Sequence, residues 1–304
     1  MGVQINAPIA LFAYNRPFHL RRTIEALLEN PEARQSELFV FSDAAKNADT
    51  AADVEEVRHY IKRISGFAGM QVVQREENFG LARSIVDGVS RLCAEYGRVI
   101  VVEDDLVTSP HFLKYMNEGL DLHEDDDQVI SIHGYVYPVK RALPETFFLC
   151  GADCWGWATW KRGWDLFERD GRVLLRELLE RDLAYRFDFD GAYPFTEMLR
   201  DQIAGKNDSW AIRWNASAFL NGKLTLYPGR SLVSNIGLDG TGTHPADTDE
   251  FSGAVADSPI AVKRMAFREN EVARQEIIKY FRKTRPSLPA RMVRRLFNFA
   301  RHPR

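Results

Sequence analysis

Short apolar runs alternate with amphipathic stretches through the first half of the chain. Runs of strand length lie at residues 8–14, 38–43, 70–74 and 98–105. Apolar residues at helical spacing follow the first three runs, at residues 20–28, 54–64 and 81–96. Pro17 stands where the first of these helices would begin, a position that proline favours. Two further strands are predicted at residues 129–135 and 146–150.

Strands that alternate with helices form βαβ units with right-handed crossovers. The pattern therefore predicts an α/β fold with a mostly parallel sheet flanked by helices. Ligands of such sheets bind beyond the carboxyl ends of the strands. The first candidate site residues are the polar residues that follow the predicted strands. They are Asn15, Arg16, Asp43, Asn78, Glu103, Asp104 and Asp105.

The composition is that of a globular protein. Of 304 residues, 45% are hydrophobic and 27% are charged, which excludes disorder, collagen and coiled-coil arrays. No apolar run approaches the roughly 20 residues of a membrane-spanning helix. The N-terminus lacks the pattern of a signal peptide, and three scattered cysteines form no disulfide framework. We therefore expect a cytoplasmic protein with reduced thiols.

Charge is distributed unevenly along the chain. The net charge is −3, yet residues 285–304 hold six arginines and no acid, so the body of the protein is acidic. An acidic body argues against general nucleic-acid binding. Residues 290–301 predict a basic amphipathic helix, which could lie peripherally on the inner face of an anionic membrane. A helix docked on the acidic body or at a dimer interface is the alternative.

The clearest chemical signal is the triplet Glu103–Asp105, directly after an apolar strand. Adjacent carboxylates repel one another unless a cation or hydrogen-bond donors offset their charge. Hard divalent ions prefer such oxygen ligands. The triplet thus predicts a metal site, with a polar strand end or helix cap as the alternative. No Walker A motif is present, and the glycine-rich stretch 237–244 lacks the strand–helix context of a dinucleotide loop.

The second half of the chain adds three features. Residues 154–164 contain four of the six tryptophans, which fill a core or form a platform on which sugars stack. Asp208 directly precedes an aromatic, helical segment, where it could be a base or a helix N-cap. His244 ends the glycine-rich loop, as a solvated residue or a third metal ligand. The candidate sugar platform is Trp155, Trp157 and Trp210.

Taken in order, these motifs resemble a GT-A (Rossmann-like) glycosyltransferase of the family 2 type. They also resemble the related N-acetylglucosaminyltransferase I group. The matching segments are residues 11–17, 41–43, 78–83, 101–106, 155–160, 208–214 and 240–244. One departure is that the triplet is Glu-Asp-Asp, whereas Asp-X-Asp is the commoner form of the family's motif.

The resemblance implies a role for each matching residue. Asp105 would coordinate the Mn²⁺ or Mg²⁺ that binds the donor diphosphate, with Asp104 near the ribose and Glu103 near the donor sugar. Asp43 would contact the nucleotide base, and Arg16 would lie near the nucleotide. Asn78 and Arg83 would close over the donor, Asp208 would be the general base, and His244 would reach the metal or diphosphate.

We therefore expect an inverting, metal-dependent hexosyl- or N-acetylhexosaminyltransferase. Its donor would be a nucleotide sugar, UDP-linked by preference, and its acceptor a glycan or lipid-linked saccharide. Residues 1–135 would bind the donor, residues 136–284 would bind the acceptor and carry the base within the same domain, and residues 285–304 would form the helical tail. A metal-dependent phosphotransfer enzyme and a non-catalytic carbohydrate-binding module are the alternatives.

Overall fold

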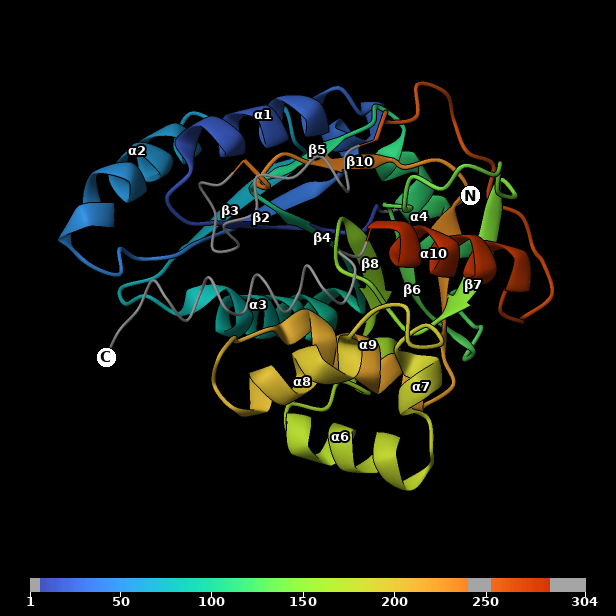
Figure 1. Cartoon of the computed structure of the whole chain (residues 1–304). Coiled ribbons are helices and arrows are strands. Elements are labelled where there is room, and N and C mark those ends of the chain that lie inside the picture. Colours follow the sequence, from blue (N-terminus) through green and yellow to red (C-terminus); the bar gives the residue numbers. More distant parts are fainter. Residues whose placement is uncertain (1–5, 240–252, 285–304) are drawn as a thin grey trace.

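A single eight-stranded sheet forms the centre of the protein (Figure 1), seen in a computed structural model that describes residues 6–239 and 253–284. The strand order is β3-β2-β1-β4-β8-β6-β9-β7, and β10 pairs with β5 in a small second sheet. The strands are β1 (Ile9–Ala13), β2 (Glu37–Ser42), β3 (Gly69–Gln74), β4 (Arg98–Glu103), β5 (Leu106–Thr108), β6 (Val129–His133), β7 (Thr146–Cys150), β8 (Trp157–Trp160), β9 (Leu224–Pro228) and β10 (Val233–Asn235).

The first half of the sheet has the predicted parallel arrangement. β3, β2, β1 and β4 run parallel, as the alternation of strand and helix predicts. β8 then pairs antiparallel with both β4 and β6, β9 runs parallel to β6, and β7 closes the sheet antiparallel to β9. The α/β fold with a mostly parallel sheet is thus confirmed. The pattern of the sequence did not predict β8, which lies inside the tryptophan-rich segment.

Helices cover both faces of the sheet. They are α1 (Pro17–Leu28), α2 (Ala51–Ile61), α3 (Gly80–Tyr96), α4 (Phe112–Leu122), α5 (Lys161–Trp164), α6 (Gly171–Glu180), α7 (Ala184–Phe187), α8 (Phe195–Ile203), α9 (Trp210–Leu220) and α10 (Glu271–Thr284). Short 3-10 helices lie at Pro31–Gln35 and Ala48–Thr50. Among the residues described, no helix is both long and apolar enough to cross a bilayer.

Side-chain alternation along β1 separates two cores. Ile9 and Leu11 point to the face covered by α1, α2 and α4. Ala10 and Phe12 point to the opposite face, covered by α3 and α9. This follows from the two-residue period of a strand, whose successive side chains leave opposite faces. Figure 1 shows the same layers, with α1 and α2 on one side of the strands and α3 and α9 on the other.

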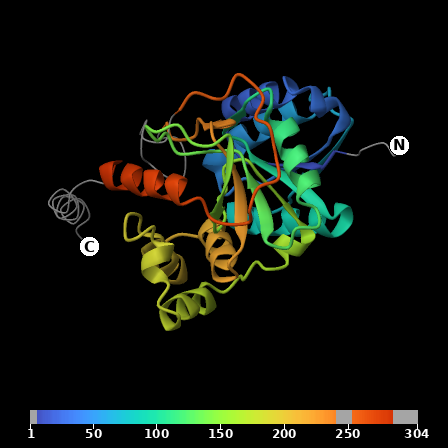
Figure 2. The same ribbon diagram turned by 90° about the vertical axis from the view of Figure 1, so that its right-hand side faces the viewer.

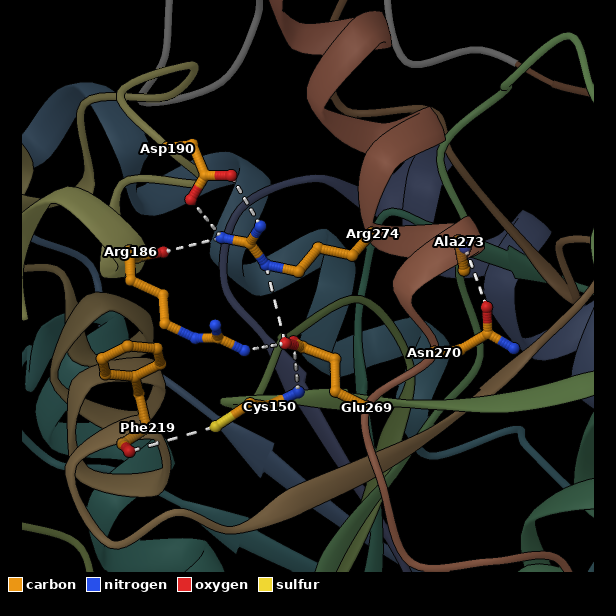
Figure 3. Close-up of polar contacts among 8 residues, drawn as sticks. All are labelled: Cys150, Arg186, Asp190, Phe219, Glu269, Asn270, Ala273 and Arg274. Carbon is orange, nitrogen blue, oxygen red and sulfur yellow. Dashed lines mark hydrogen bonds and ion pairs between the residues drawn. The ribbon is translucent and has the colours of Figure 1, made fainter.

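α10 is bound to the α7–α8 loop through a buried arginine. Arg274 donates two hydrogen bonds to the carboxylate of Asp190, at 2.7 and 2.8 Å, and Glu269 lies on its other side (Figure 3). Asp190 and Phe189 both have positive φ angles, which side chains other than glycine adopt infrequently. The ion pair therefore stabilises a loop conformation that the backbone alone disfavours. Figure 2 shows α10 and the first two helices on opposite sides of the strands.

Candidate active site

Three neighbouring strands bring the predicted polar residues to one edge of the sheet. Phe12 of β1 lies opposite Glu103, the last residue of β4, and Ala13 lies opposite Ser42, the last residue of β2. Their carboxyl ends therefore lie side by side. The segments that follow them carry Arg16, Asp43 and the rest of the triplet. The site predicted beyond these strand ends is thus assembled as expected.

Asp104 is bound to the loop after β1. Its carboxylate accepts a hydrogen bond from the backbone N–H of Tyr14 at 3.1 Å, and its carbonyl oxygen accepts one from the Thr23 hydroxyl at 2.9 Å. The side chain is buried. Burial, followed by the nearby carboxylate of Asp105, raises the pKa of Asp104 to about 7. The residue holds the β4 turn against the start of α1.

Asp105 forms an ion pair with Arg16, with 2.8 Å between Nη1 and Oδ2. Arg16 also donates to the carbonyl oxygen of Gly237 at 3.2 Å, and the N–H of Ile236 donates to the Asp105 carbonyl at 2.9 Å. Pairing of β10 with β5 brings residues 236 and 237 to this position. Three segments that are distant in the sequence therefore meet at Asp105.

The charged forms of the triplet's carboxyl groups are disfavoured by burial and by one another. Burial raises the pKa of Glu103 well above its usual range, and the carboxylates of Asp105 and Asp104 raise it further. Burial also raises the pKa of Asp105, although the Arg16 guanidinium opposes that effect. Carboxylates destabilised in this way bind a hard divalent cation favourably, because its charge relieves their repulsion. The donor set at this edge of the sheet therefore fits Mg²⁺ or Mn²⁺.

The described residues do not form a complete metal cage. In the described ranges, 6–239 and 253–284, no three acidic, imidazole or thiol groups are arranged as a metal-binding cluster. A cation at Asp105 would therefore need further oxygen ligands, such as those of a bound diphosphate. His244, the predicted third ligand, lies outside the described residues, as does the predicted tail helix.

Asp43 holds the beginning of α3. One carboxylate oxygen accepts from the backbone N–H groups of Ala44 and Phe79 at 2.9 and 2.8 Å. The other accepts from the Gly80 N–H at 2.9 Å and from the side-chain amide of Asn78 at 3.2 Å. Asp43 is 5% exposed, so this cluster is well shielded from water. Asp43 and Asn78, both predicted to contact the nucleotide-sugar donor, are therefore in direct contact with each other. Together they set the position of α3.

Arg83 lies at the surface of the first turns of α3. Its guanidinium stands 3.5 Å from the centre of the Phe79 ring and forms an ion pair with Glu77 at 2.9 Å. The guanidinium of Arg75 lies 4.3 Å from the same ring. Cation–π contacts of this kind hold both arginines near the ring. The chain thus carries basic side chains beside the segment that was predicted to close over a donor.

The prediction of an aromatic platform is wrong for two of its three tryptophans. Trp157 and Trp210 are 0% and 3% exposed, and their rings stack on each other with centres 5.4 Å apart in the core below α9. A ring enclosed by protein cannot stack on a sugar. Trp155 is only partly buried, and its ring meets Tyr135 edge to face at 4.8 Å. Its position is compatible with a platform.

Asp208 lies exposed at the entrance of α9. Its side chain is 74% exposed and approaches the guanidinium of Arg213 at 3.5 Å. The alternative of an N-cap is wrong, because Ser209 caps the helix by accepting the N–H of Ile212 at 3.2 Å. Trp210, two residues after Asp208, stacks on Trp157.

The start of α9 thereby lies at the same edge of the sheet as the triplet. Trp157 is opposite Val101 of β4, close to the carboxyl end of that strand. Because Trp210 stacks on this residue, α9 begins near that end. A solvent-facing carboxylate at this edge of the sheet can accept a proton from a bound hydroxyl group.

Two contributors to the site were not among the predicted residues. Tyr14 acts through its backbone N–H, so its side-chain type carries no signal. Gly237 acts through its carbonyl oxygen and its lack of a side chain. The glycine-rich composition of residues 237–244 was the available signal, but it indicated a loop and not a contact with Asp105.

Comparison with known proteins gives one family and several distant structures. The model of the family described as Glycosyl transferase family 2 matches residues 9–171. The mannosyltransferase PcManGT from Pyrobaculum calidifontis, solved with GDP-Man and Mn²⁺, is 14% identical with a TM-score of 0.34, over 44% of this chain and 36% of that chain. Residues 1–349 of TarS from S. aureus are 14% identical with a TM-score of 0.35, over 53% of this chain and 48% of that chain.

These structural matches are partial. The chain spans less than half the length of either protein. No curated protein matches the sequence.

Proposed function

Because this chain belongs to glycosyl transferase family 2 and is a glycosyltransferase, we propose that its donor is a UDP-sugar and its acceptor a glycan or lipid-linked saccharide. The transfer would invert the configuration of the anomeric carbon and would require Mn²⁺ or Mg²⁺. Family membership favours this reaction over the phosphotransfer enzyme and the non-catalytic module that the sequence left open. The relationship to the N-acetylglucosaminyltransferase I group stays a prediction.

One observation carries the proposal: an acidic triplet at the sheet edge, of which Asp104 is buried and Asp105 is paired with the guanidinium of Arg16. Asp105 would hold the divalent ion, which when bound stabilises the negative charge that develops on a leaving diphosphate, and Glu103 would lie near the donor sugar. Arg16 already lies at Asp105, with 2.8 Å between the two groups. Its planar guanidinium can donate two hydrogen bonds to phosphate oxygens as well as to a carboxylate. Arg16 would therefore bind the diphosphate beside the cation.

The donor nucleotide would lie along the ends of β2 and β4. Asp104 would approach the ribose, and Asp43 with Asn78 would form the surface that contacts the nucleobase. Asp43 already accepts four hydrogen bonds, which fix the position of this surface. The site is therefore preorganised before the nucleotide binds. Arg83, exposed at the start of α3, would contact the diphosphate from the solvent-facing side of the site.

Asp208 would be the general base. It would take the proton of the acceptor hydroxyl as that oxygen attacks the anomeric carbon from the face opposite the diphosphate. A single displacement of this kind inverts the configuration of that carbon. General-base help contributes on the order of 10²–10⁴-fold to rate. Arg213, 3.5 Å away, would orient the carboxylate.

Nucleotide binding in the presence and absence of metal tests the proposal directly. Thermal shift with UDP, GDP and their sugars should show stabilisation by UDP that requires Mn²⁺. Asp105→Ala should lose this stabilisation, whereas Asp165→Ala, which removes an exposed carboxylate paired with Lys161, should retain it. Mn²⁺-dependent UDP affinity that persists in Asp105→Ala would contradict the assignment of the metal site.

A further inference from the structure

The loop from Gly151 to Gly156 crosses the protein toward the proposed site. It leaves β7 at Cys150, which lies opposite Leu224 at the beginning of β9. It enters β8 at Trp157, which lies opposite Val101 near the end of β4. Because β9 and β4 begin at the same edge of the sheet, the loop runs from that edge to the carboxyl edge. Side chains in its second half therefore lie next to the acidic triplet.

The backbone of this loop is held at several points. Asn215 of α9 accepts the N–H of Ala152 at 3.2 Å, and Nε2 of His133 accepts the N–H of Trp155 at 3.1 Å. The carbonyl oxygen of Gly156 accepts the N–H of Gly134 at 2.7 Å. These three contacts hold the loop without involving the side chain of Asp153.

Asp153 has a fixed orientation nonetheless. Its Oδ2 accepts the hydroxyl of Tyr137 at 3.1 Å, and its Oδ1 accepts the N–H of Cys154 at 3.1 Å. Tyr137 is itself packed edge to face against Phe281, with ring centres 4.8 Å apart. A carboxylate has about four lone-pair directions, so two of them are available to a ligand. Asp153 is only partly buried, which leaves it accessible from solvent.

The thiol of Cys154 interacts electrostatically with both Asp153 and the triplet. Burial raises the pKa of the Cys154 thiol well above its usual range, and the carboxylates of Asp153, Glu103 and Asp105 raise it further. The thiol therefore lies within electrostatic reach of Asp153 on one side and of the triplet on the other. The next residue, Trp155, is partly exposed and stands beside this group.

We propose that Asp153 and Trp155 form the acceptor-sugar subsite, in which the carboxylate binds two hydroxyl groups of a neutral sugar and the indole contacts its apolar face. The proposal rests on the glycosyltransferase function proposed above. A carboxylate fixed by two donors suits neighbouring hydroxyl groups, which can each donate to a separate oxygen. The same negative charge disfavours acceptors that carry a carboxylate or phosphate near the reacting hydroxyl. The subsite therefore selects neutral saccharides.

Kinetics with defined acceptors test this subsite. The probes are the methyl β-glycosides of glucose, galactose, mannose and N-acetylglucosamine, with methyl β-glucuronide as the anionic analogue of the glucoside. Two reactions are measured on the full chain: release of UDP without acceptor and transfer to each glycoside. Asp153→Asn keeps the shape and the Tyr137 contact but removes the charge. Asp201→Asn, an exposed carboxylate paired with Lys206, is the matched control.

Asp153→Asn should raise the acceptor KM about 10-fold or more, the range expected for a lost hydrogen bond to a charged group. The preference for glucoside over glucuronide should shrink. Tyr137→Phe, which frees Asp153 without changing its charge, should raise KM by a smaller factor and leave the preference intact. Asp201→Asn should change neither.

The outcomes separate the two proposals. An acceptor KM in Asp153→Asn that equals the wild-type value, with the preference for neutral acceptors unchanged, would overturn the subsite while the transferase function stands. Failure of the wild-type chain to release UDP from any UDP-sugar in the presence of Mn²⁺ would instead contradict the function on which the subsite rests.

Discussion

Gly237 lies so close to Asp105 that a Cβ atom on it would stand 2.0 Å from the carboxylate oxygen Oδ2. The same atom would be 2.6 Å from Nη1 of Arg16. Both distances are far below van der Waals contact. The β10–β5 pair thus places a glycine where the backbone must approach the Arg16–Asp105 ion pair.

Gly237→Ala should therefore displace Asp105 or Arg16 and reduce activity by about 10-fold or more. Overpacking of this kind typically costs about 1–3 kcal/mol when the neighbours move. Mn²⁺-dependent UDP binding by calorimetry is the measurement. Gly253→Ala is the control, because among the described residues its Cβ would meet Pro138 alone, at the ordinary contact distance of 3.9 Å. Equal UDP affinities in the two variants would mean that the site tolerates the displacement.

Asp208→Asn should lower kcat by about 100-fold or more, within the range of general-base catalysis. The amide keeps the shape of the side chain but cannot take the proton, so donor affinity should stay close to that of the wild type. Steady-state kinetics with saturating donor provide the measurement. A fall in kcat of less than about tenfold would leave Asp208 without a role as base.

Asp43→Ala should destabilise the fold as well as weaken nucleotide binding. The substitution leaves the partly buried N–H groups of Phe79 and Gly80 without their acceptor, a loss of about 1–3 kcal/mol in the free energy of unfolding. Denaturant unfolding measures the change. Asp170→Ala removes the exposed cap of α6 and should cost clearly less. Similar losses in both variants would contradict a buried supporting role for Asp43.

Arg274→Met should lower the free energy of unfolding by about 1.5–3 kcal/mol, because it removes the charged hydrogen bonds to the partly exposed carboxylate of Asp190. The hydrogen bonds of Arg274 also lower the pKa of Asp190, as expected for a carboxylate that is stabilised in its charged form. Lys279→Met, on the exposed side of the same helix, should change stability little.

A double-mutant cycle checks the cause of that loss. Arg274→Met combined with Asp190→Asn should cost less than the sum of the single changes, because the second change removes the unpaired charge. Additive losses would indicate that packing of the Arg274 stem, and not the ion pair, carries the effect.

His133 makes stability depend on pH. Burial lowers its pKa in the folded protein, so the folded protein resists protonation while the unfolded chain takes up a proton below about pH 6.5. Stability from this residue is therefore present above that pH and decreases on acidification toward the folded pKa, by up to about 1.4 kcal/mol per pH unit.

His133→Gln removes the titrating group while keeping an acceptor for the Trp155 N–H. Between pH 7 and pH 5 its free energy of unfolding should fall less steeply than that of the wild type. Denaturant unfolding at several pH values gives both slopes. Parallel curves for the two proteins would show that His133 is not responsible.

Strands β1, β2 and β4 of the parallel half were predictable because they are buried on both faces. Ile9 to Ala13, for example, is fully apolar and ends at a polar segment, which is the local signature of such a strand. β8 was missed because its neighbours β4 and β6 come from elsewhere in the chain. Nothing local distinguishes a tryptophan that pairs into a sheet from one that faces a ligand.

The acids of the site were predictable for a similar reason. A carboxylate directly after a strand end lies at the sheet edge whatever the rest of the fold does, as Asp43 and Asp105 show. Tyr14 contributes a backbone N–H, which its residue type does not indicate, and the glycine at position 237 indicated a loop but not its contact with Arg16 and Asp105. Trp210 was misplaced because burial depends on the packing of α9 against β8.

The position of β8 in the sheet has a consequence for synthesis of the chain. β3, β2, β1 and β4 can pair once residue 103 has left the ribosome, since these strands are neighbours in the sheet and come first in the sequence. The free edge of β4, with its apolar side chains, must then wait for residues 157–160. An unpaired apolar edge is a template for association with other chains. While residues 104–156 emerge, this edge of β4 therefore stays open to association with other chains.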